Sequence, residues 1–534
     1  MVSEIETFAF STWSSQQTQL VLLTMALFAA LESCFLSDLA VYTLTATVAV
    51  LLFCQIRAWY RLRHIPGPWS APWSVWWQLR GAMSGVFPQT LKEATDRYGP
   101  LVRIGPNQLV SPDPEVLRRM SAVRGNYVKA RFYKAARVVP GVDNVVSALD
   151  EDKHKTMRAQ MNSTFTVKGD EEYGFEAAMD RQIQNFVTML ETKYTSAESE
   201  IRPVDMAEKI QFLALDIIGD ISLGKPFGYL KQDRDLYNFN EINMSSLPIL
   251  TFVSILPGIA DVIHTWPFRL ALPKEGDQVG FGRLLKLVTK SVEIAMHRNE
   301  AKEGALVQNH VHIGLTKNDM IQQGFVAIIA GSNTTAHSIL MTLLSLIAAP
   351  TAFKALQKEI DEASASFHDP ISWHEIRQLP YLQAVIKESL RMWPPVSGLG
   401  FKLVPPGGEH INGYFVPGGT EIGQAFLAVG RSRQIWGADA DVFRPERWLC
   451  ASQADLTKMN KAVDTHFGGG KFSCLGKPIA MMELHKTVYE LMKRFDMAII
   501  HPDKPMKTKA SIFVCDTDFW VTLRKRPAPN ECQH

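Results

Sequence analysis

Two long apolar stretches stand near the start of the chain, ahead of the mixed hydrophobic and polar pattern that follows. The first covers residues 20–36 and contains Glu32, and the second covers 39–56 without a charged residue. A helix that crosses a bilayer needs roughly 20 mostly apolar residues. The second stretch, slightly extended, meets this length, whereas a carboxylate makes the first a marginal span. We predict a polar tail over 1–18 and a membrane anchor over 19–56.

The basic residues after the anchor predict its orientation in the membrane. Arg57, Arg61 and Arg63 follow it directly, and such residues stay on the cytosolic side of a membrane. We expect the body of the protein in the cytosol, with the N-terminus in the lumen for one span or in the cytosol for two. A cleaved signal peptide fits less well, because the basic residues come after a long apolar run. The proline-rich segment 57–70 is predicted to be a hinge.

Beyond the hinge, the hydrophobic pattern is mostly that of helices. Alternation over 101–110 predicts a short strand pair, and the longest predicted helix covers 317–348. Asn318 or Asp319 is the expected cap of this helix, and Pro350 ends it. About 32 residues span roughly 48 Å, enough to cross a whole domain. Because the segment is apolar almost all round, we expect it to be central and buried.

Polar residues interrupt this apolar helix at one place, the run Ala330-Gly331-Ser332-Asn333-Thr334-Thr335. Such a run is costly to bury unless it has a function. Further helices are predicted over 381–393 and 476–495, with short strands and turns between them. The apolar stretch 246–273 is broken by four prolines. It belongs either to the lipid surface or to the core, and the sequence does not choose.

The composition is that of an ordinary folded protein, with 46% hydrophobic and 21% charged residues. The net charge of +2 gives no reason to expect a nucleic acid as partner. Six cysteines are too few for a disulfide scaffold, and no pair has the spacing of a zinc finger or a redox motif. They are Cys34, Cys54, Cys450, Cys474, Cys515 and Cys532.

One cysteine lies in a setting suited to chemistry. The segment Phe467-Gly468-Gly469-Gly470-Lys471-Phe472-Ser473-Cys474-Leu475-Gly476 places it between a glycine-rich loop and the start of a helix. Glycines let the backbone approach a flat ligand closely, and a helix N-terminus favours a thiolate. A thiolate at Cys474 can ligate a soft metal centre, including haem iron. The alternative is an inert, buried cysteine beside a phosphate-type loop.

Two more motifs precede this loop. Glu388 and Arg391 lie three apart on a predicted helix and share a face, and Pro445-Glu446-Arg447-Trp448 follows in an irregular segment. Together with the 330–335 run and the cysteine loop, in this order, they resemble the cytochrome P450 superfamily of haem-thiolate monooxygenases. The resemblance implies a mainly α fold with small β-sheets over 71–534, behind an N-terminal transmembrane helix, with haem b between two helices.

The resemblance also implies the roles of individual residues. Cys474 would be the axial thiolate and Phe467 would pack beside its sulfur, in the loop that Gly470 and Gly476 shape. A buried charge network would lock the segment under the haem, and its members would be Glu388, Arg391 and Arg447. Phe472 stands where the family has a propionate-binding Arg or His. The propionates are therefore expected at Arg158, His154 and Lys402.

The oxygen side of the expected site departs from the family at one residue. Asn333 stands where the family has an acid that relays protons together with the neighbouring threonine, Thr334. An amide can hold water but does not exchange protons as a carboxylate does. Catalysis is expected from Thr334, Asn333 and Cys474, with proton delivery through water or with an unusual reaction. We expect Asn333→Asp to change how reductant use is coupled to product.

The expected enzyme inserts one oxygen atom from O2 into a lipophilic secondary metabolite, of the terpenoid, alkaloid or polyketide class. Lys471 and its neighbours resemble fungal enzymes of the pisatin demethylase type. Desaturation or ring rearrangement is the alternative reaction, and a non-catalytic haem carrier is a third hypothesis. Without a flavin or nicotinamide fingerprint, electrons are expected from an NADPH–cytochrome reductase at the endoplasmic reticulum. His154, Lys155, Lys471 and Lys477 would form its basic docking patch.

Overall fold

The computed structural model describes residues 41–50, 52–137, 139–165, 174–298 and 305–527. The chain divides into two compact units, Met1–Arg63 and His64–His534. In the first unit a helix of 22 residues, Val41–Leu62, is long and apolar enough to cross a membrane. The predicted tail over 1–18, the stretch 20–36 with Glu32, and the thiols of Cys34 and Cys532 lie outside the described residues.

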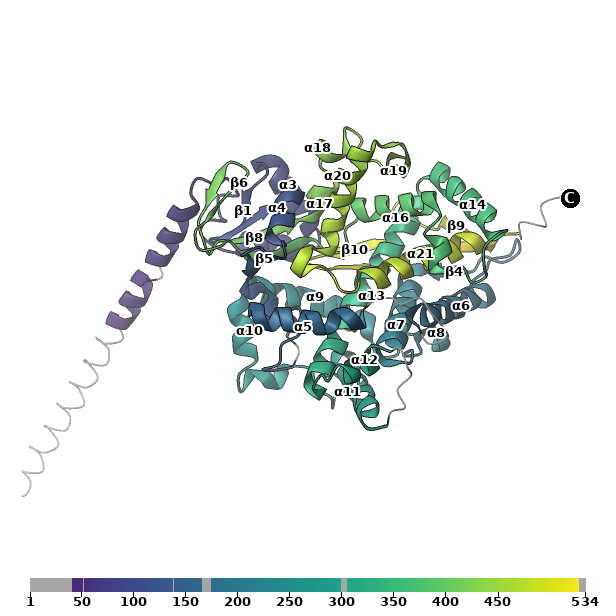
Figure 1. Ribbon diagram of the computed structural model, residues 1–534, viewed down its shortest axis with the longest axis horizontal. Helices are drawn as coiled ribbons and strands as arrows, with labels where there is room; N and C mark the ends of the chain where they lie inside the picture. The colour runs from purple at the N-terminus through teal and green to yellow at the C-terminus, as the bar shows by residue number, and fades with distance from the viewer. Residues whose placement is uncertain (1–40, 51, 138, 166–173, 299–304, 528–534) are drawn as a thin grey trace, which may run out of the picture. The chain divides into compact units, whose positions relative to one another are not determined.

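The second unit, which we call the main unit, is mainly helical (Figure 1). Its α-helices are α2 (Trp76–Met83), α3 (Phe87–Tyr98), α4 (Pro114–Met120), α5 (Glu151–Thr164), α6 (Phe175–Lys193), α7 (Met206–Leu223), α8 (Tyr229–Gln232), α9 (Phe239–Ile255), α10 (Pro257–Ile263), α11 (Gly280–Arg298), α12 (Leu306–His312), α13 (Lys317–Ile347), α14 (Pro350–Ser364), α15 (Trp373–Ile376), α16 (Pro380–Met392), α17 (Phe426–Gly430), α18 (Arg433–Trp436), α19 (Arg447–Cys450), α20 (Gln453–Asp464) and α21 (Lys477–Arg494). Short 3-10 turns are η1 (Arg131–Ala136), η2 (Phe268–Ala271), η3 (Thr465–Phe467) and η4 (Gly470–Phe472).

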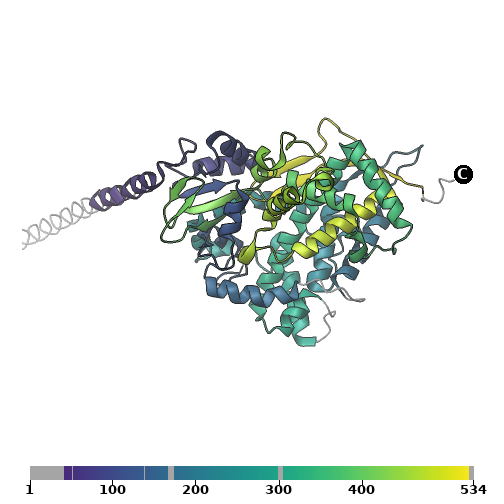
Figure 2. The same cartoon turned by 45° about the horizontal axis from the view of Figure 1, so that its top comes forward.

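Strands form four small sheets in the described residues. They are β1 (Val102–Arg103), β2 (Gln108–Ser111), β3 (Val128–Lys129), β4 (Pro203–Asp205), β5 (Gly398–Leu403), β6 (Glu409–Ile411), β7 (Tyr414–Val416), β8 (Glu421–Ala425), β9 (Phe495–Ile499), β10 (Lys507–Ala510), β11 (Val514–Thr517) and β12 (Trp520–Lys525). The largest sheet has the order β1-β2-β8-β5-β3, and only its β2–β8 pair is parallel. In both views its strands lie at one side of the main unit, and helices fill the rest (Figures 1 and 2).

Helix α13 is the core of the main unit, as its apolar sequence predicts. It packs against α7, α11, α16 and α21, and most of its residues are buried. It is long and apolar enough to cross a membrane, but most of it is buried inside the protein. Its cap is Thr316, whose side chain accepts the N–H of Asp319. The prediction of Asn318 or Asp319 as cap is wrong, because the helix begins at Lys317 and the hydroxyl before it takes that role.

Most other predicted elements are present. The strand pair over 101–110 is the antiparallel pair β1–β2, with Val102 opposite Val110. The predicted helices over 381–393 and 476–495 are α16 and α21. The proline-broken stretch over 246–273 becomes α9, α10 and η2, and Pro248 lies inside α9. The chain bends by 110° between α9 and α10.

Candidate active site

The cysteine loop is closed tightly between η3 and the first turn of α21. The N–H of Cys474 donates to the carbonyl oxygen of Phe467 at 2.7 Å. Gly470 has a φ of +46°, and a Cβ there would clash with the carbonyl oxygen of Ser121. Glycine is required at this position for both reasons. The loop therefore presents Cys474 three residues before the first residue of α21, Lys477.

Burial disfavours the thiolate form of Cys474 until a cation binds its sulfur. Burial raises the pKa of this thiol, while the N–H groups of Gly476 and Lys477 and the charge of Arg158 act to lower it. The side chain is nevertheless accessible rather than packed against protein. A bound metal cation deprotonates such a thiol outright. This donor fits a soft metal centre such as haem iron.

The facing helix, α13, also has an opening beside it. Ala330 is exposed although it lies in the middle of the central helix, and Thr334, one turn on, is half-buried. The hydroxyl of Thr334 donates to the carbonyl oxygen of Ala330 at 2.7 Å. Because α13 packs against α21, small residues that are accessible on α13 indicate an internal space next to the helix that follows Cys474.

Asn333 does not point into this space. It is buried, and its amide forms two hydrogen bonds with the amide of Asn243 on α9, at 2.8 and 3.0 Å. We expected Asn333 to take part in catalysis beside Thr334, but the structure pairs its amide with Asn243 instead. Helix geometry turns neighbouring side chains about 100° apart, so Thr334 can face the space while Asn333 faces α9.

The predicted charge network is fully formed behind the loop. Arg391 pairs with Glu388 at 2.8 Å, and Arg447 pairs with the same carboxylate at 2.9 Å. The side chains of Glu388 and Arg391 have no exposed surface. Arg391 also donates to backbone carbonyls between residues 430 and 442, Trp448 donates to Glu388, and Arg447 donates to Asp439. This network ties α16 to the segment that leads into the cysteine loop.

Helix α5 brings two of the predicted propionate residues to the loop. Arg158 donates to the carbonyl oxygen of Ser473 at 2.7 Å and to its hydroxyl at 2.5 Å. His154, one turn earlier, is buried, and its ring centroid lies 5.5 Å from that of Phe472. Burial and the nearby cations, first among them Lys129, lower the pKa of His154 to about 3. The imidazole is therefore neutral at physiological pH.

Lys402 lies on β5 and is buried near Phe472. It donates to the carbonyl oxygen of Gly400 at 2.8 Å and is hydrogen-bonded to the hydroxyl of Tyr133. Its Nζ lies 4.7 Å from the ring centroid of Phe472, a cation–π contact. Burial, and then the charge of Lys129, lower the pKa of Lys402 to about 7.

Lys129 is a member of this cluster that the sequence did not reveal. It lies on β3 directly opposite Lys402 on β5, and burial lowers its pKa to about 7. Like charges directly opposite each other destabilise a sheet. Tyr133, which bonds Lys402, was also missed. Neither residue has a local motif, and only the β3–β5 pairing brings them to the cysteine loop.

These basic groups, which we call the cation cluster, lack a matching set of carboxylates. The cluster consists of the cations Lys129, Arg158 and Lys402, with the neutral imidazole of His154 beside them. Glu151 pairs with Lys471 at 2.6 Å instead, and within the described part of the chain no carboxylate forms an ion pair with Lys129, Arg158 or Lys402. Buried positive charge without a counter-charge is expensive. An anionic ligand with two carboxylates, as haem has, fits this cluster.

The predicted docking patch needs a correction. His154 is buried and neutral, so it cannot be a surface cation. Lys471 is turned inward to Glu151 and to the carbonyl oxygen of Gly125. Lys155 is exposed, and Lys477 is partly exposed and pairs with Asp464 at 2.7 Å. Only these two of the four predicted residues face solvent.

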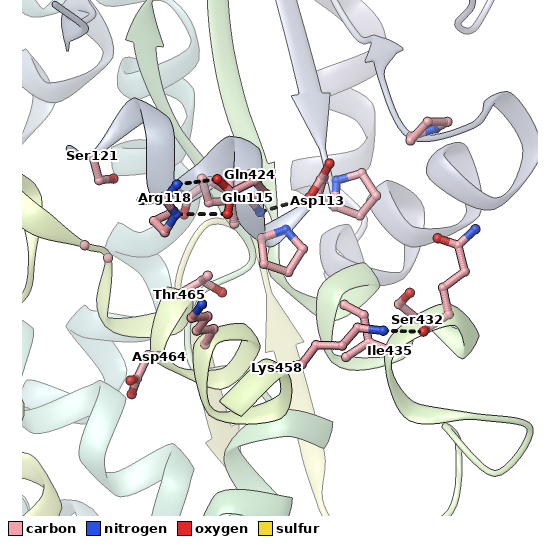
Figure 3. Close-up of a pocket in the computed structure, with 18 residues that line it drawn as sticks. Asp113, Glu115, Arg118, Ser121, Gln424, Ser432, Ile435, Lys458, Asp464 and Thr465 are labelled. Carbon is pink, nitrogen blue, oxygen red and sulfur yellow. Dashed lines mark hydrogen bonds and ion pairs between the residues drawn. The ribbon is translucent and has the colours of Figure 1, made fainter. Parts of the chain in front are cut away.

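A hollow of about 500 Å³ lies on another side of the cysteine loop, where Gly468 and Gly469 line it (Figure 3). Its rim carries charges of both signs, among them Arg118, which pairs with Glu115, and Lys458, which donates to the carbonyl oxygen of Gln434. Neither Cys474 nor any residue of α13 lines it. This hollow therefore includes neither Cys474 nor the accessible residues of α13.

Comparison with known proteins decides the family. The sequence profile of the family Cytochrome P450 matches residues 66–518. The chain is a cytochrome P450. It is 33% identical to the cytochrome P450 monooxygenase ABA1 of Pyricularia oryzae over 503 residues, which cover 91% of this chain and 98% of that relative. It is 32% identical to the aba1 enzyme of Botryotinia fuckeliana over 452 residues, covering 83% and 88%. It is 31% identical to the abl1 enzyme of Leptosphaeria maculans over 484 residues, covering 89% and 85%.

Family membership settles the cofactor and the class of enzyme. This cytochrome P450 is a monooxygenase that holds haem iron through a cysteine thiolate. The mainly helical fold with small sheets is the one that the motifs imply. The roles of individual side chains toward haem and dioxygen are proposed from the contacts of those side chains.

Proposed function

We propose that this cytochrome P450 inserts one atom of O2 into a lipophilic secondary metabolite of the terpenoid, alkaloid or polyketide class. The observation that carries the oxidative chemistry is the accessible Cys474 thiol beside a buried cation cluster that lacks carboxylates. The metabolic setting rests on similarity to fungal monooxygenases such as ABA1. Electrons come from an NADPH–cytochrome reductase.

The proposed haem site would use residues of the cysteine loop, α5, β3 and β5. Cys474 holds the iron, and the backbone shape given by Phe467, Gly470 and Gly476 keeps its sulfur accessible. When bound, haem supplies the redox chemistry that activates dioxygen. The cation cluster, with Tyr133, binds the carboxylates. The buried network of Glu388, Arg391 and Arg447 stays outside the chemistry and keeps the segment before the loop in place.

On the oxygen side, Thr334 is the residue that handles protons. Its hydroxyl hydrogen is held by the Ala330 carbonyl at 2.7 Å, so its oxygen is available to accept a hydrogen bond from water. Proton delivery then depends on Thr334 and water, with no carboxylate at position 333. The alternative reactions, desaturation or ring rearrangement, drew their support from Asn333. The amide pair with Asn243 accounts for that residue without them.

We place the enzyme at the endoplasmic reticulum membrane, with the main unit in the cytosol. The helix Val41–Leu62 is the proposed single span; it begins within the anchor predicted over 19–56 and continues to residue 62, so the first part of the segment predicted as a hinge over 57–70 is helical. The stretch over 246–273 adds a second apolar contact. Its exposed large side chains are Ile249, Phe252, Val262, Trp266, Phe268 and Leu270. Aromatic residues among them suit a membrane interface, so a lipophilic substrate can enter from the lipid.

We also propose where the reductase binds. The exposed Lys461 lines the hollow of Figure 3, and the partly exposed Lys477 pairs with Asp464, which also lines it. Positive charge there attracts an acidic flavoprotein and raises the association rate. This site replaces the docking patch around His154.

The thiolate ligand is tested by spectroscopy on the purified full chain. Reduction followed by carbon monoxide is expected to give the red-shifted band of a thiolate-ligated haem, and Cys474→Ala is expected to abolish it. Cys450→Ala, at an exposed cysteine outside the loop, is the matched control and is expected to keep the band. An unchanged band in the Cys474 variant contradicts the assignment of the ligand.

The substrate class is tested with the reductase and isotopically labelled oxygen. Candidate terpenoids, alkaloids and polyketides are supplied in lipid vesicles, and product mass is measured. Gain of one labelled oxygen atom supports the proposed reaction. Loss of two hydrogens, or rearrangement without labelled oxygen, supports the alternative.

A further inference from the structure

Helices α9 and α13 are joined in the protein interior by one reciprocal pair of amides. The Nδ2 of Asn243 donates to Oδ1 of Asn333 at 2.8 Å, and the Nδ2 of Asn333 donates back to Oδ1 of Asn243 at 3.0 Å. Only 2% and 6% of these two residues is exposed. A buried amide that loses its partner pays the full cost of desolvation, so each side chain holds the other in place.

The amide pair holds the turn of α13 that carries Thr334. Asn333 directly precedes Thr334, whose hydroxyl bonds Ala330 within the same turn. On another side, Gly331 packs against Ile218 of α7, where a Cβ at Gly331 would lie 3.1 Å from the end of that side chain. The turn is thus held between α7 and α9, and the hold from α9 is a polar one.

An amide suits this place better than an acid. Asn243 offers one donor and one acceptor, and Asn333 offers the matching acceptor and donor. A carboxylate at position 333 would set two acceptor oxygens against Oδ1 of Asn243 in a buried place. In the described residues, no charged side chain forms a hydrogen bond or ion pair with Asn243 or Asn333. A carboxylate at position 333 would therefore have no cation to neutralise it.

Helix α9 has a second polar tie, farther along. The hydroxyl of Thr251 donates to the hydroxyl of Ser511 at 3.0 Å, and both are buried. Ser511 lies in the turn between β10 and β11. The position of α9 is therefore defined by two specific contacts, one on α13 and one on this turn, rather than by apolar packing alone.

We propose that Asn243 is a positioning residue for oxygen activation, acting through Asn333 on the α13 turn that carries Thr334. Movement of α9 is then transmitted to the oxygen side of the haem through the amide pair. The inference rests on the family's use of dioxygen and does not depend on the proposed substrate class or on the reductase.

The test uses leucine, which is close to asparagine in size but has no polar group. Asn243→Leu, Asn333→Leu and the double variant are prepared as haem-loaded full chains. Ser245→Leu is the matched control, since Ser245 is exposed on the same helix. One readout is the thermal unfolding temperature. The other is the rate at which the dithionite-reduced protein returns to its ferric spectrum after mixing with aerated buffer, which needs neither substrate nor reductase.

Each single variant is expected to unfold at a lower temperature, because one amide is left unpaired, and to return to the ferric spectrum several-fold faster. The double variant is expected to regain part of the unfolding temperature, since it leaves no orphaned amide. Its rate should match those of the single variants, because both changes remove one interaction. Ser245→Leu should match the wild type in both readouts.

Two results would overturn the proposal. If Asn333→Leu accelerates the return and Asn243→Leu does not, Asn333 acts without Asn243. If all three variants lower the unfolding temperature but keep the wild-type rate, the pair is a packing contact with no influence on the oxygen side. Failure of either kind leaves the thiolate assignment untouched, because that is read from the carbon monoxide band.

Discussion

The network around Glu388 and the cation cluster are both buried in the main unit, and they differ in how far the chain neutralises their charge. In the network of Glu388, Arg391 and Arg447, every charge meets an opposite charge, and backbone carbonyls take the remaining N–H groups. In the cation cluster, Lys129 and Lys402 lie opposite each other on β3 and β5. Backbone carbonyls accept from Lys129, but no carboxylate in the described residues forms an ion pair with either lysine. The first cluster is complete as folded, whereas the second is complete only with an anionic ligand.

Breaking the complete network is expected to have the largest effect. Glu388→Gln leaves Arg391 and Arg447 as buried cations without a counter-charge, which costs about 3–5 kcal/mol of the free energy of unfolding. Denaturant titrations of haem-free and haem-loaded protein are expected to show this loss in both forms. Glu115→Gln, in an exposed ion pair, is the control and should change little. Equal losses in the two variants would contradict the comparison.

The cation cluster is expected to respond with opposite signs in the two forms. Lys402→Met removes a buried charge that no carboxylate in the described residues balances, so the haem-free protein should gain stability, by about 1–2 kcal/mol. Lys129 is kept in this variant, because its Nζ donates to the carbonyl oxygens of Val145, Val146 and Ala148, which methionine would leave unpaired. The Lys402→Met protein should release haem faster, because the propionates lose a partner. Unfolding titrations and transfer of haem to apomyoglobin measure the two effects. A loss of stability in the haem-free variant would refute the unbalanced cluster.

The pH dependence sharpens the same point. In the folded haem-free protein both lysines have a pKa of about 7, against 10.5 for the unpaired residue. Between these values the unfolded chain binds more protons than the folded one, so the free energy of unfolding should rise with pH from about 7 to 10. The Lys402→Met variant should show a smaller rise, and bound haem should reduce the rise in the wild type. The difference between wild type and variant in the free energy of unfolding, measured at each pH, isolates Lys402.

The smallest effect is expected at the surface. Lys477 forms a partly exposed pair with Asp464, and such pairs contribute about 0–1 kcal/mol. Lys477→Gln should therefore leave haem content and unfolding nearly unchanged, while reduction by the reductase slows at low salt. Lys155→Gln, on the surface of α5, is the comparison. If that variant slows reduction more than Lys477→Gln does, the docking site is misplaced.

What the sequence could predict follows from how local each signal is. The cysteine loop, the Glu388–Arg391 spacing and the long helix over 317–348 are contiguous patterns, so they were found with nearly correct bounds. Lys129 and Tyr133 could not be found this way, since the β3–β5 register alone places them beside Lys402. The same holds for Asn333, whose partner Asn243 lies 90 residues away.

Burial explains the other corrections. His154 and Lys471 looked like surface cations because their sequence neighbours are polar. The structure turns His154 inward, on the face of α5 toward Phe472, and occupies Lys471 with Glu151. The hydrophilic helix α5 thus carries His154 and Arg158, which we propose to bind the cofactor's carboxylates. Helical periodicity alone does not distinguish such residues from solvated surface residues.

The central claim is that the cation cluster binds the carboxylates of haem, and one measurement tests it most directly. Haem and haem dimethyl ester, which lacks both negative charges, are bound to the haem-free wild type and to the Lys129→Met, Lys402→Met double variant, and the ratio of the two dissociation constants is compared. We predict a strong preference of the wild type for haem and a largely lost preference in the variant. The same ratio in both proteins would contradict the account.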